Sequence, residues 1–346
     1  MFVAWRDLRF AKGRFALLGT VVVLMTLLVG LLSGLTAGLA GQSTSAIAGL
    51  KADRLVFSDL GSGSLSFGQS TVTREQAAQY ARIPGVTSAT PIGISTANAS
   101  SGTQVATVST FAVRPDSGLA PGKTGPGTVV LSTGAADKLH ARTGDRITLQ
   151  GKQVTVATIA GDASYSHLPV VWTEFAGTDA TVLAVTTTDP GQLAAADARL
   201  GTRAVPTDDA LSAIGSYSAE NGSLQLMRGF LFVISALVIG AFFTVWTIQR
   251  SRDIAVLKAL GATTKYLLRD ALGQAVLLLA GGTALGTGLA AALGAIASGT
   301  VPFVLSAATL LAPAAVLVLL GLLGAALAIR RITSVDPLTA LTSGAH

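Results

Sequence analysis

The chain has 346 residues, of which 50% are hydrophobic and only 12% are charged, and its formal net charge is +6. Soluble domains carry about 25% charged residues, so this composition excludes an ordinary soluble protein and indicates a membrane protein. The sequence holds no cysteine, which excludes disulfide bonds, thiolate metal sites and thiol redox chemistry.

The chain begins with a basic amphipathic stretch, which a long apolar run follows. Residues 15–40 carry no charged side chain. A membrane helix needs about 20 apolar residues, whereas the apolar part of a signal peptide has about 7–15. We therefore predict a cytoplasmic N-terminus over residues 1–14 and a retained transmembrane helix over residues 15–41.

Residues 42–226 are predicted to form an extracytoplasmic mixed α/β domain whose ends are stalks. Alternation of β-branched and polar residues predicts strands in QVATVSTFAV, GTVVLS, DRITLQ and KQVTVATIAG. The stretches REQAAQYARIPGV, STGAADKLHARTGD and TDPGQLAAADARL are typical of short helices. Two stretches are expected to be loops, ANASSGTQ (97–104) and LAPGKTGPGT (119–128).

The sequence of this domain contains no recognisable catalytic constellation. Its histidines are His140 and His167, and HExxH, GxSxG and usefully spaced acid pairs are missing. LAPGKTGPGT lacks the GxxxxGK[ST] spacing of a phosphate-binding loop. These features favour binding or mechanical coupling over catalysis.

Three more transmembrane helices are predicted over residues 227–249, 271–298 and 304–330, because these segments are long and apolar. Residues 299–303 are predicted to be an outer hairpin between the last two. Three glycines are expected to allow close helix packing, namely Gly282, Gly286 and Gly294.

Basic residues gather in three segments: residues 1–14, 250–270 and 331–346, together with Arg330 just before the last. The positive-inside rule places these segments in the cytoplasm. The predicted protein is therefore an α-helical, multi-pass cell-membrane protein with four transmembrane helices and both termini cytoplasmic. The basic residues do not alternate with stacking aromatic residues, so no nucleic-acid partner is expected.

The predicted cytoplasmic loop, residues 250–270, contains a short amphipathic helix. Ile254, Leu257 and Leu260 share one apolar face, and Gly261 is expected to end the helix. This helix is either an interfacial anchor or a lever that docks into a cytoplasmic partner, and spacing alone favours the anchor.

Two motifs resemble those of a known family. RDIAVLKALGATTKYLLRDALGQ resembles the coupling loop of FtsX-like, or MacB-type, ABC transporter permeases, and RRITSVDPLTAL (330–341) resembles their C-terminal signature. The amphipathic start and the order of the spans are similar too. The resemblance favours the lever and implies that the ATPase is contacted by Arg252, Asp253, Ile254, Leu257, Lys258, Leu260 and Gly261.

The resemblance also implies partners. The chain has no Walker A motif, so ATP and Mg²⁺ would be held by a separate cytoplasmic ABC ATPase subunit. The implied assembly is a homodimer of the permease in membrane lipid, with two ATPases. The permease itself is then not an enzyme and binds no permanent cofactor.

Within this family, LSGLTAGL, KADRLVFS and GSYSAENGSLQLM resemble the haem-exporting branch of Gram-positive bacteria. Tyr217, Ala219 and Glu220 fit the Tyr-x-Ala-Glu element of that branch, whereas Asn221 departs from the glutamine expected there. The resemblance implies haem export. The alternatives are another cargo (lipid, lipoprotein, peptide or drug) and an FtsX-like, non-transporting activator of a cell-wall hydrolase.

The candidate substrate contacts follow from the chemistry of haem. No histidine lies in a predicted span, so Glu220 or Tyr217 could offer oxygen to ferric iron, and Met25 or Met227 could offer sulfur. Glu220 and Met25 are the candidate iron ligands, and Arg228 is the candidate partner of a propionate. Each residue also has a plain structural interpretation: packing, capping, interfacial anchoring or a position at the membrane boundary.

Overall fold

A computed structural model of the protein describes residues 12–59, 61, 63–249, 256, 261 and 263–333. The chain forms two compact units. The outer domain comprises Leu39–Gly222, and the membrane unit comprises Met1–Gly38 with Ser223–His346.

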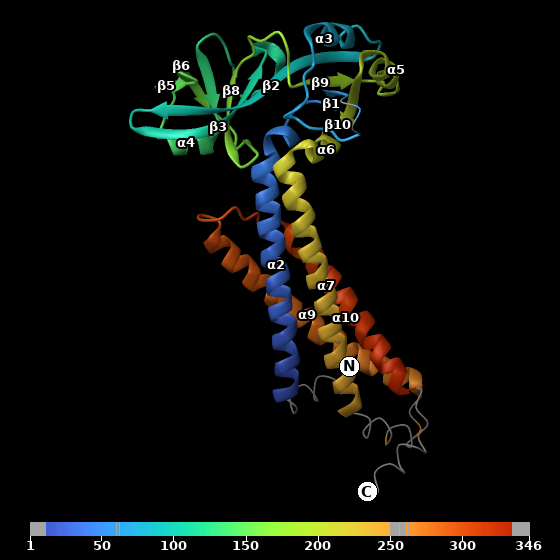
Figure 1. The fold of residues 1–346 in the computed structure, drawn as a ribbon. Helices are drawn as coiled ribbons and strands as arrows, with labels where there is room; N and C mark the ends of the chain where they lie inside the picture. The colour runs from blue at the N-terminus through green and yellow to red at the C-terminus, as the bar shows by residue number, and fades with distance from the viewer. Residues whose placement is uncertain are drawn as a thin grey trace. The chain divides into compact units, whose positions relative to one another are not determined.

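The described residues of the outer domain form a ten-stranded sheet (Figure 1). Its strands are β1 (Arg54–Ser58), β2 (Val86–Ser101), β3 (Gln104–Val113), β4 (Thr128–Leu131), β5 (Arg146–Leu149), β6 (Lys152–Ile159), β7 (Ser164–Tyr165), β8 (Leu168–Glu174), β9 (Val182–Thr187) and β10 (Thr202–Pro206). The order is β10-β1-β9-β2-β3-β8-β4-β6-β5, and β7 pairs with β8. The strands predicted from alternation are β3, β4, β5 and β6, and all four are confirmed.

The longest strand, β2, joins two parts of the sheet. Its first part pairs with β9 and its second part pairs with β3. Ala99 and Ser100 also pair with Leu149 and Thr148 of β5. The strands β2, β3, β8, β4, β6 and β5 therefore close on themselves, which leaves fewer free strand edges.

The predicted loop over residues 97–104 is wrong, because most of it is strand. Residues 97–101 are the end of β2, Gln104 begins β3, and a turn at Gly102 joins the two strands. The sequence signal was weak because this half of β2 is Ala, Asn and Ser rather than β-branched. These small residues have a packing reason, since Ala97 and Ala99 lie in the buried cluster that contains Leu139 of α4 (Thr133–Leu139).

Three short helices form where the sequence predicts them, namely α3 (Arg74–Tyr80), α4 and α5 (Gly191–Leu200). A further short helix, α6 (Thr207–Ala210), precedes a 3₁₀ turn. The start of α3 is fixed by a capping box, in which Gln76 N–H donates to the Thr73 hydroxyl and Thr73 N–H donates to Gln76 Oε1.

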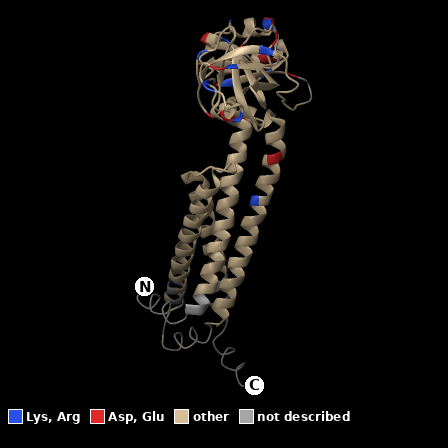
Figure 2. Ribbon diagram, turned by 90° about the vertical axis from the view of Figure 1, so that its left-hand side faces the viewer, with Lys and Arg blue, Asp and Glu red and all other residues tan. Residues whose placement is uncertain are grey.

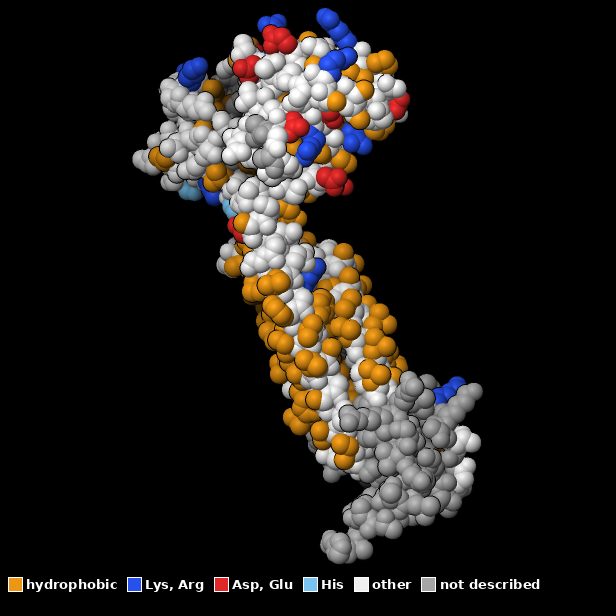
Figure 3. All heavy atoms as spheres, turned by 45° about the vertical axis from the view of Figure 1, so that its right-hand side comes forward, with side chains coloured by type: hydrophobic (Ala, Val, Ile, Leu, Met, Phe, Trp, Pro, Cys, Tyr) orange, Lys and Arg blue, Asp and Glu red, His pale blue; other side chains and the backbone are white. Residues whose placement is uncertain are grey.

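Four helices are long and apolar enough to cross a membrane, counting the described residues alone. They are α2 (Lys12–Ala48), α7 (Gly215–Gln249), α9 (Thr264–Ala297) and α10 (Ala307–Thr333). Each extends beyond the apolar segment predicted for it at one end or both, because helical hydrogen bonding continues into neighbouring polar residues. Large apolar side chains line their exposed surface (Figure 3), whereas the charged side chains among the described residues gather on the outer domain (Figure 2). The predicted fold class is confirmed.

Glycines set the packing inside the membrane unit. Gly30, Gly34 and Gly38 repeat every four residues along α2, so they lie on one helix face. A Cβ atom would lie 2.9 Å from the Ala290 side chain at Gly30, 2.2 Å from the Phe303 ring at Gly34 and 1.9 Å from the Pro302 carbonyl oxygen at Gly38.

The glycines that the sequence singled out on α9 play the same role. A Cβ atom at Gly282, Gly286 or Gly294 would approach a neighbouring residue to within 2.8, 2.6 or 2.3 Å. The prediction of close packing at these three positions is confirmed. The segment between α9 and α10 therefore docks closely on α2, and Val304 N–H donates to the Gly34 carbonyl at 3.1 Å.

Most of the predicted coupling loop lies outside the described residues. This applies to Arg252, Asp253, Ile254, Leu257, Lys258 and Leu260, and to the Asp336-Pro337 pair. Gly261 is described and has a φ of +93°, a conformation that favours glycine and suits a helix end. The next helix, α9, is capped by the Thr263 hydroxyl, which accepts from Tyr266 N–H.

Candidate functional site

The β7–β8 hairpin carries the most unusual backbone of the outer domain. Its turn residues are Ser166 and His167, with φ values of +52° and +64°. Two successive residues with positive φ make the kind of turn that Asn-Gly usually fills. The left-handed region costs about 1–2 kcal/mol per residue with a Cβ atom. The contacts that the Ser166 and His167 side chains make therefore offset the cost of their left-handed backbone conformation.

The turn is bonded to the outer end of α2 through its backbone. Ser166 N–H donates to the Ser43 carbonyl and His167 N–H donates to the Gln42 carbonyl, each at 3.1 Å. Ser164 N–H also donates to Ser45 Oγ at 2.9 Å. These bonds satisfy backbone donors of the turn, and their acceptors Gln42, Ser43 and Ser45 lie in the last two turns of α2.

The same turn is bonded to the first turns of α7 through its side chains. His167 Nε2 lies 2.9 Å from Oε2 and 3.0 Å from Oε1 of Glu220. Nε2 also lies 2.9 Å from Ser43 Oγ, and Ser166 Oγ lies 2.8 Å from Ser216 Oγ. We call Ser43, Ser166, His167, Ser216 and Glu220 the stalk cluster, since they tie the hairpin to both helices.

The hairpin is anchored in the core of the outer domain by Tyr165. Its ring packs edge-on against Phe67 and Phe111, with centroids 5.8 and 5.5 Å apart, and Phe111 packs on Trp172 at 5.1 Å. Burial raises the pKa of Tyr165 to about 12, because the phenolate would lose its hydration. The turn therefore connects a rigid aromatic core to the two helices.

The chemistry of the stalk cluster is that of binding rather than hydrolysis. Ser43, His167 and Glu220 have the composition of a catalytic triad, which needs the serine on one ring nitrogen and the acid on the other. Here Ser43 and Glu220 both lie on Nε2, so this geometry excludes a triad. The side chains of His167 and Glu220 are 31% and 43% exposed, so both can be reached from outside. The described residues hold no group of three or more potential metal ligands.

The other predicted substrate contacts make none of the bonds of this cluster. Tyr217 is half-buried against the hydrophobic core of the outer domain. Met25, Met227 and Arg228 belong to the membrane unit. Met227 is 48% exposed, Met25 is half-buried, and Arg228 Nη2 donates to Gln225 Oε1 at 2.6 Å. Sequence reasoning set His167 aside because it lies outside every span, and nothing in its local sequence points to Glu220.

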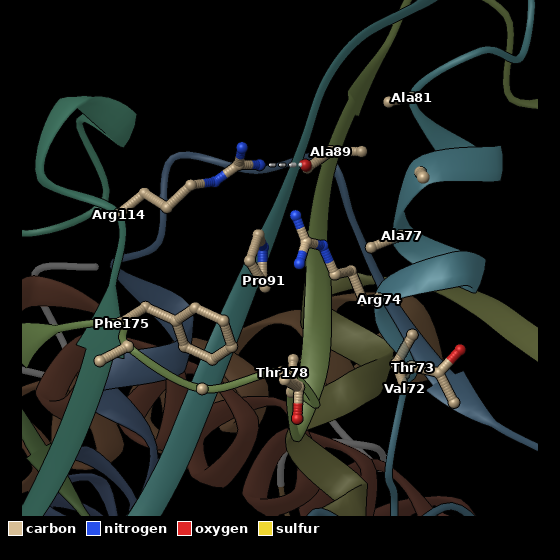
Figure 4. Close-up of a pocket in the computed structure, with 14 residues that line it drawn as sticks. Val72, Thr73, Arg74, Ala77, Ala81, Ala89, Pro91, Arg114, Phe175 and Thr178 are labelled. Carbon is tan, nitrogen blue, oxygen red and sulfur yellow. Dashed lines mark hydrogen bonds between the residues drawn. The ribbon is translucent and has the colours of Figure 1, made fainter.

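A second candidate is a cleft of about 460 Å³ in the outer domain, between α3, β2 and the segment after β8 (Figure 4). Arg74, Arg114 and Phe175 line it, and none of its lining residues is acidic. Arg114 Nη2 donates to the Ala89 carbonyl at 2.7 Å, which holds that guanidinium at the rim. Two guanidinium groups beside an aromatic ring can accept an anionic group, but no lining residue offers a nucleophile activated by a base.

Comparisons with known protein families match both parts of the chain. The family model described as the MacB-like periplasmic core domain matches residues 18–203. The model described as the FtsX-like permease C-terminal region matches residues 226–337.

Curated relatives resemble the chain over its whole length. A Staphylococcus epidermidis protein provisionally named hemin transport system permease protein HrtB is 27% identical over 99% of this chain and 100% of its own. A Staphylococcus haemolyticus protein with the same provisional name is 29% identical over 99% of each chain. An uncharacterized ABC transporter permease of Mycobacterium tuberculosis is 24% identical over 97% of this chain and 98% of its own.

Solved structures resemble the outer part of the chain. The extracellular domain of the noncanonic ABC-type transporter YknZ from Gram-positive bacteria is 14% identical, covers 45% of this chain and 100% of its own, and has a TM-score of 0.36. The periplasmic region of MacB from Actinobacillus actinomycetemcomitans is also 14% identical, covers 47% of this chain and 92% of its own, and has a TM-score of 0.37.

Proposed function

This chain belongs to the MacB- and FtsX-like family of ABC transporter permeases, and we propose that it is the subunit through which a separate ATPase drives the export of haem from the cytoplasmic membrane. The observation that carries the proposal is the likeness to relatives named for hemin transport, which extends over 99% of this chain. Membership of the family implies an ATPase partner, and the four apolar helices make the chain a multi-pass membrane protein.

The exposure of Glu220 supports this cargo. Its carboxylate is 43% exposed, and an exposed carboxylate oxygen can bind ferric iron. Tyr217 lies one turn before Glu220 on the same helix, α7. Met25 and Met227 offer thioether sulfur, which haem iron also accepts, and Arg228 offers a guanidinium to a propionate. We propose Glu220 and Met25 as the iron ligands and Tyr217, Met227 and Arg228 as supporting contacts.

The mechanical part of the proposal rests on the loop between α7 and α9. ATP-driven closure of the ATPases would push the helix around Ile254–Leu260, and α7 and α9 would carry this push across the membrane. Four spans are few for a transport path, so we propose a symmetric homodimer with two ATPases, embedded in lipid and with cytoplasmic termini. In this assembly the permease performs no catalysis itself.

A growth experiment tests the cargo and the site together. Cells that are sensitive to haem would express the permease with its ATPase, as wild type, as Glu220→Gln or as the control Glu75→Gln, which alters an exposed carboxylate on α3. Wild type and Glu75→Gln are expected to restore growth in haem, and Glu220→Gln is expected to fail. Full growth with Glu220→Gln would reject the site.

The same experiment separates the cargo from the site. If wild-type permease and ATPase give no tolerance to haem, haem is not the cargo. The family assignment would then direct the search to lipids, lipoproteins, peptides and drugs, or to activation of a cell-wall hydrolase.

A further inference from the structure

We propose that His167 is a positioning residue that holds the Glu220 carboxylate in a closed pair, and that haem must displace the imidazole before iron can bind. This inference rests on the proposed function, because it concerns the carboxylate assigned there as iron ligand. It adds a residue of the β7–β8 turn to the Glu220 carboxylate of α7.

The pairing occupies the carboxylate. Both of its oxygens lie within 3.0 Å of the single atom His167 Nε2. A carboxylate only accepts hydrogen bonds, so Nε2 carries the hydrogen and directs it at Glu220. An oxygen that accepts this hydrogen is a weaker donor to iron, because one of its lone pairs is already engaged.

The backbone of the turn is consistent with a retained role for this side chain. His167 stands in the left-handed region with a φ of +64°, next to Ser166 in the same region. Asparagine and glycine adopt this turn more readily. A histidine here presents its ring to α7 while its N–H is fixed to the Gln42 carbonyl of α2.

Ser43 gives the imidazole a second partner when the carboxylate leaves. Its Oγ lies 2.9 Å from the same Nε2, so His167 keeps one hydrogen bond after Glu220 turns away. His167 Nε2 is therefore still paired in the opened state. An unpaired Nε2 donor would cost free energy and would oppose opening. This arrangement makes Ser43 a determinant of how readily haem is accepted.

Two substitutions are expected to change haem affinity in opposite directions. His167→Asn keeps a residue that tolerates positive φ and removes the partner of Glu220, so haem should bind about two- to fivefold more tightly, the range of an exposed ion pair. Ser43→Ala removes the second partner, so opening leaves Nε2 unpaired and haem should bind about two- to tenfold more weakly. General damage to the fold would weaken binding in both variants.

The experiment titrates the full-length permease, purified in detergent, with ferric haem and follows the Soret band. The control is His140→Asn, which changes an exposed histidine that also has a positive φ, 49°. His167→Asn is expected to raise the affinity and to leave the spectrum of bound haem unchanged, whereas Glu220→Gln is expected to change that spectrum.

The outcomes separate this inference from the proposed function. A lost or shifted Soret band in His167→Asn would mean that His167 is itself an iron ligand, and this would overturn the positioning role. Unchanged haem affinity in both His167→Asn and Ser43→Ala would also overturn the positioning role. A wild-type permease that binds no haem, or a Glu220→Gln variant that binds it normally with an unchanged spectrum, would instead refute the proposed site.

Discussion

The substitution Gly38→Ala tests the close docking of the α9–α10 connection on α2. A Cβ atom at this position would lie 1.9 Å from the Pro302 carbonyl oxygen, whereas ordinary contacts begin at 3.4 Å. The two segments must then separate by 3.4 − 1.9 = 1.5 Å. The obstacle is backbone, so no side-chain rotation can relieve it.

The expected loss of stability follows from three contributions. Overpacking costs about 1–3 kcal/mol, and displacement of the connection weakens the Val304 N–H bond to the Gly34 carbonyl, worth about 1 kcal/mol. Replacement of a helical glycine by alanine returns about 1 kcal/mol. The net destabilisation is therefore about 1–3 kcal/mol.

A matched control lies on the same helix. Gly19 has no atom within 4 Å of a Cβ position, so Gly19→Ala should gain about 1 kcal/mol from helix propensity alone. Thermal unfolding of the purified permease, followed by circular dichroism at a helical wavelength, should give a lower Tm for Gly38→Ala than for Gly19→Ala. Equal Tm values would refute the docking geometry.

Three further substitutions and one control substitution probe the outer domain. The pKa of Tyr165 is about 12 in the folded protein and about 10 in the unfolded chain. The stabilisation from its neutral phenol is therefore present below pH 10 and is lost between pH 10 and 12. At pH 11 this loss is about 1.4 kcal/mol of unfolding free energy, and denaturant titrations of Tyr165→Phe should lack it. Thr73→Ala deletes the capping box of α3 and should cost about 1 kcal/mol at neutral pH, and an unchanged midpoint would contradict the cap. Ala99→Leu should destabilise the outer domain by about 1–3 kcal/mol, because Ala99 is buried beneath α4. The control Val105→Leu changes a residue that is 70% exposed, so it should leave the stability unchanged in the same titration.

The membrane helices were predictable because each depends on a local property. Unbroken apolar runs identify α2, α7, α9 and α10, and alternation identifies β3 to β6. The second half of β2 was missed because alanine, serine and asparagine carry little strand preference. Its strand character comes from pairing with β3 and from packing under α4, neither of which is local.

The candidate site was predictable only in part. Glu220 drew attention because a carboxylate stands where an apolar helix begins. Its partner His167 is 53 residues away in sequence, and the two meet because the β7–β8 hairpin folds back onto both helices. A turn of two non-glycine residues gives no sequence signal for such a contact. The glycines of α2 recur every four residues in the sequence, which predicts a packing face. The sequence does not predict that Gly38 packs against Pro302.

The absence of cysteine from all 346 residues makes the chain a ready background for reversible crosslinking. Ser166 and Ser216 hold their hydroxyl oxygens 2.8 Å apart, so sulfur atoms at these positions would have to approach by about 0.8 Å to form a bond of about 2.0 Å. A double variant, Ser166→Cys with Ser216→Cys, could therefore be locked by oxidation and released by dithiothreitol. The proposed export, measured before and after reduction, would then reveal whether the hairpin must part from α7 in each cycle.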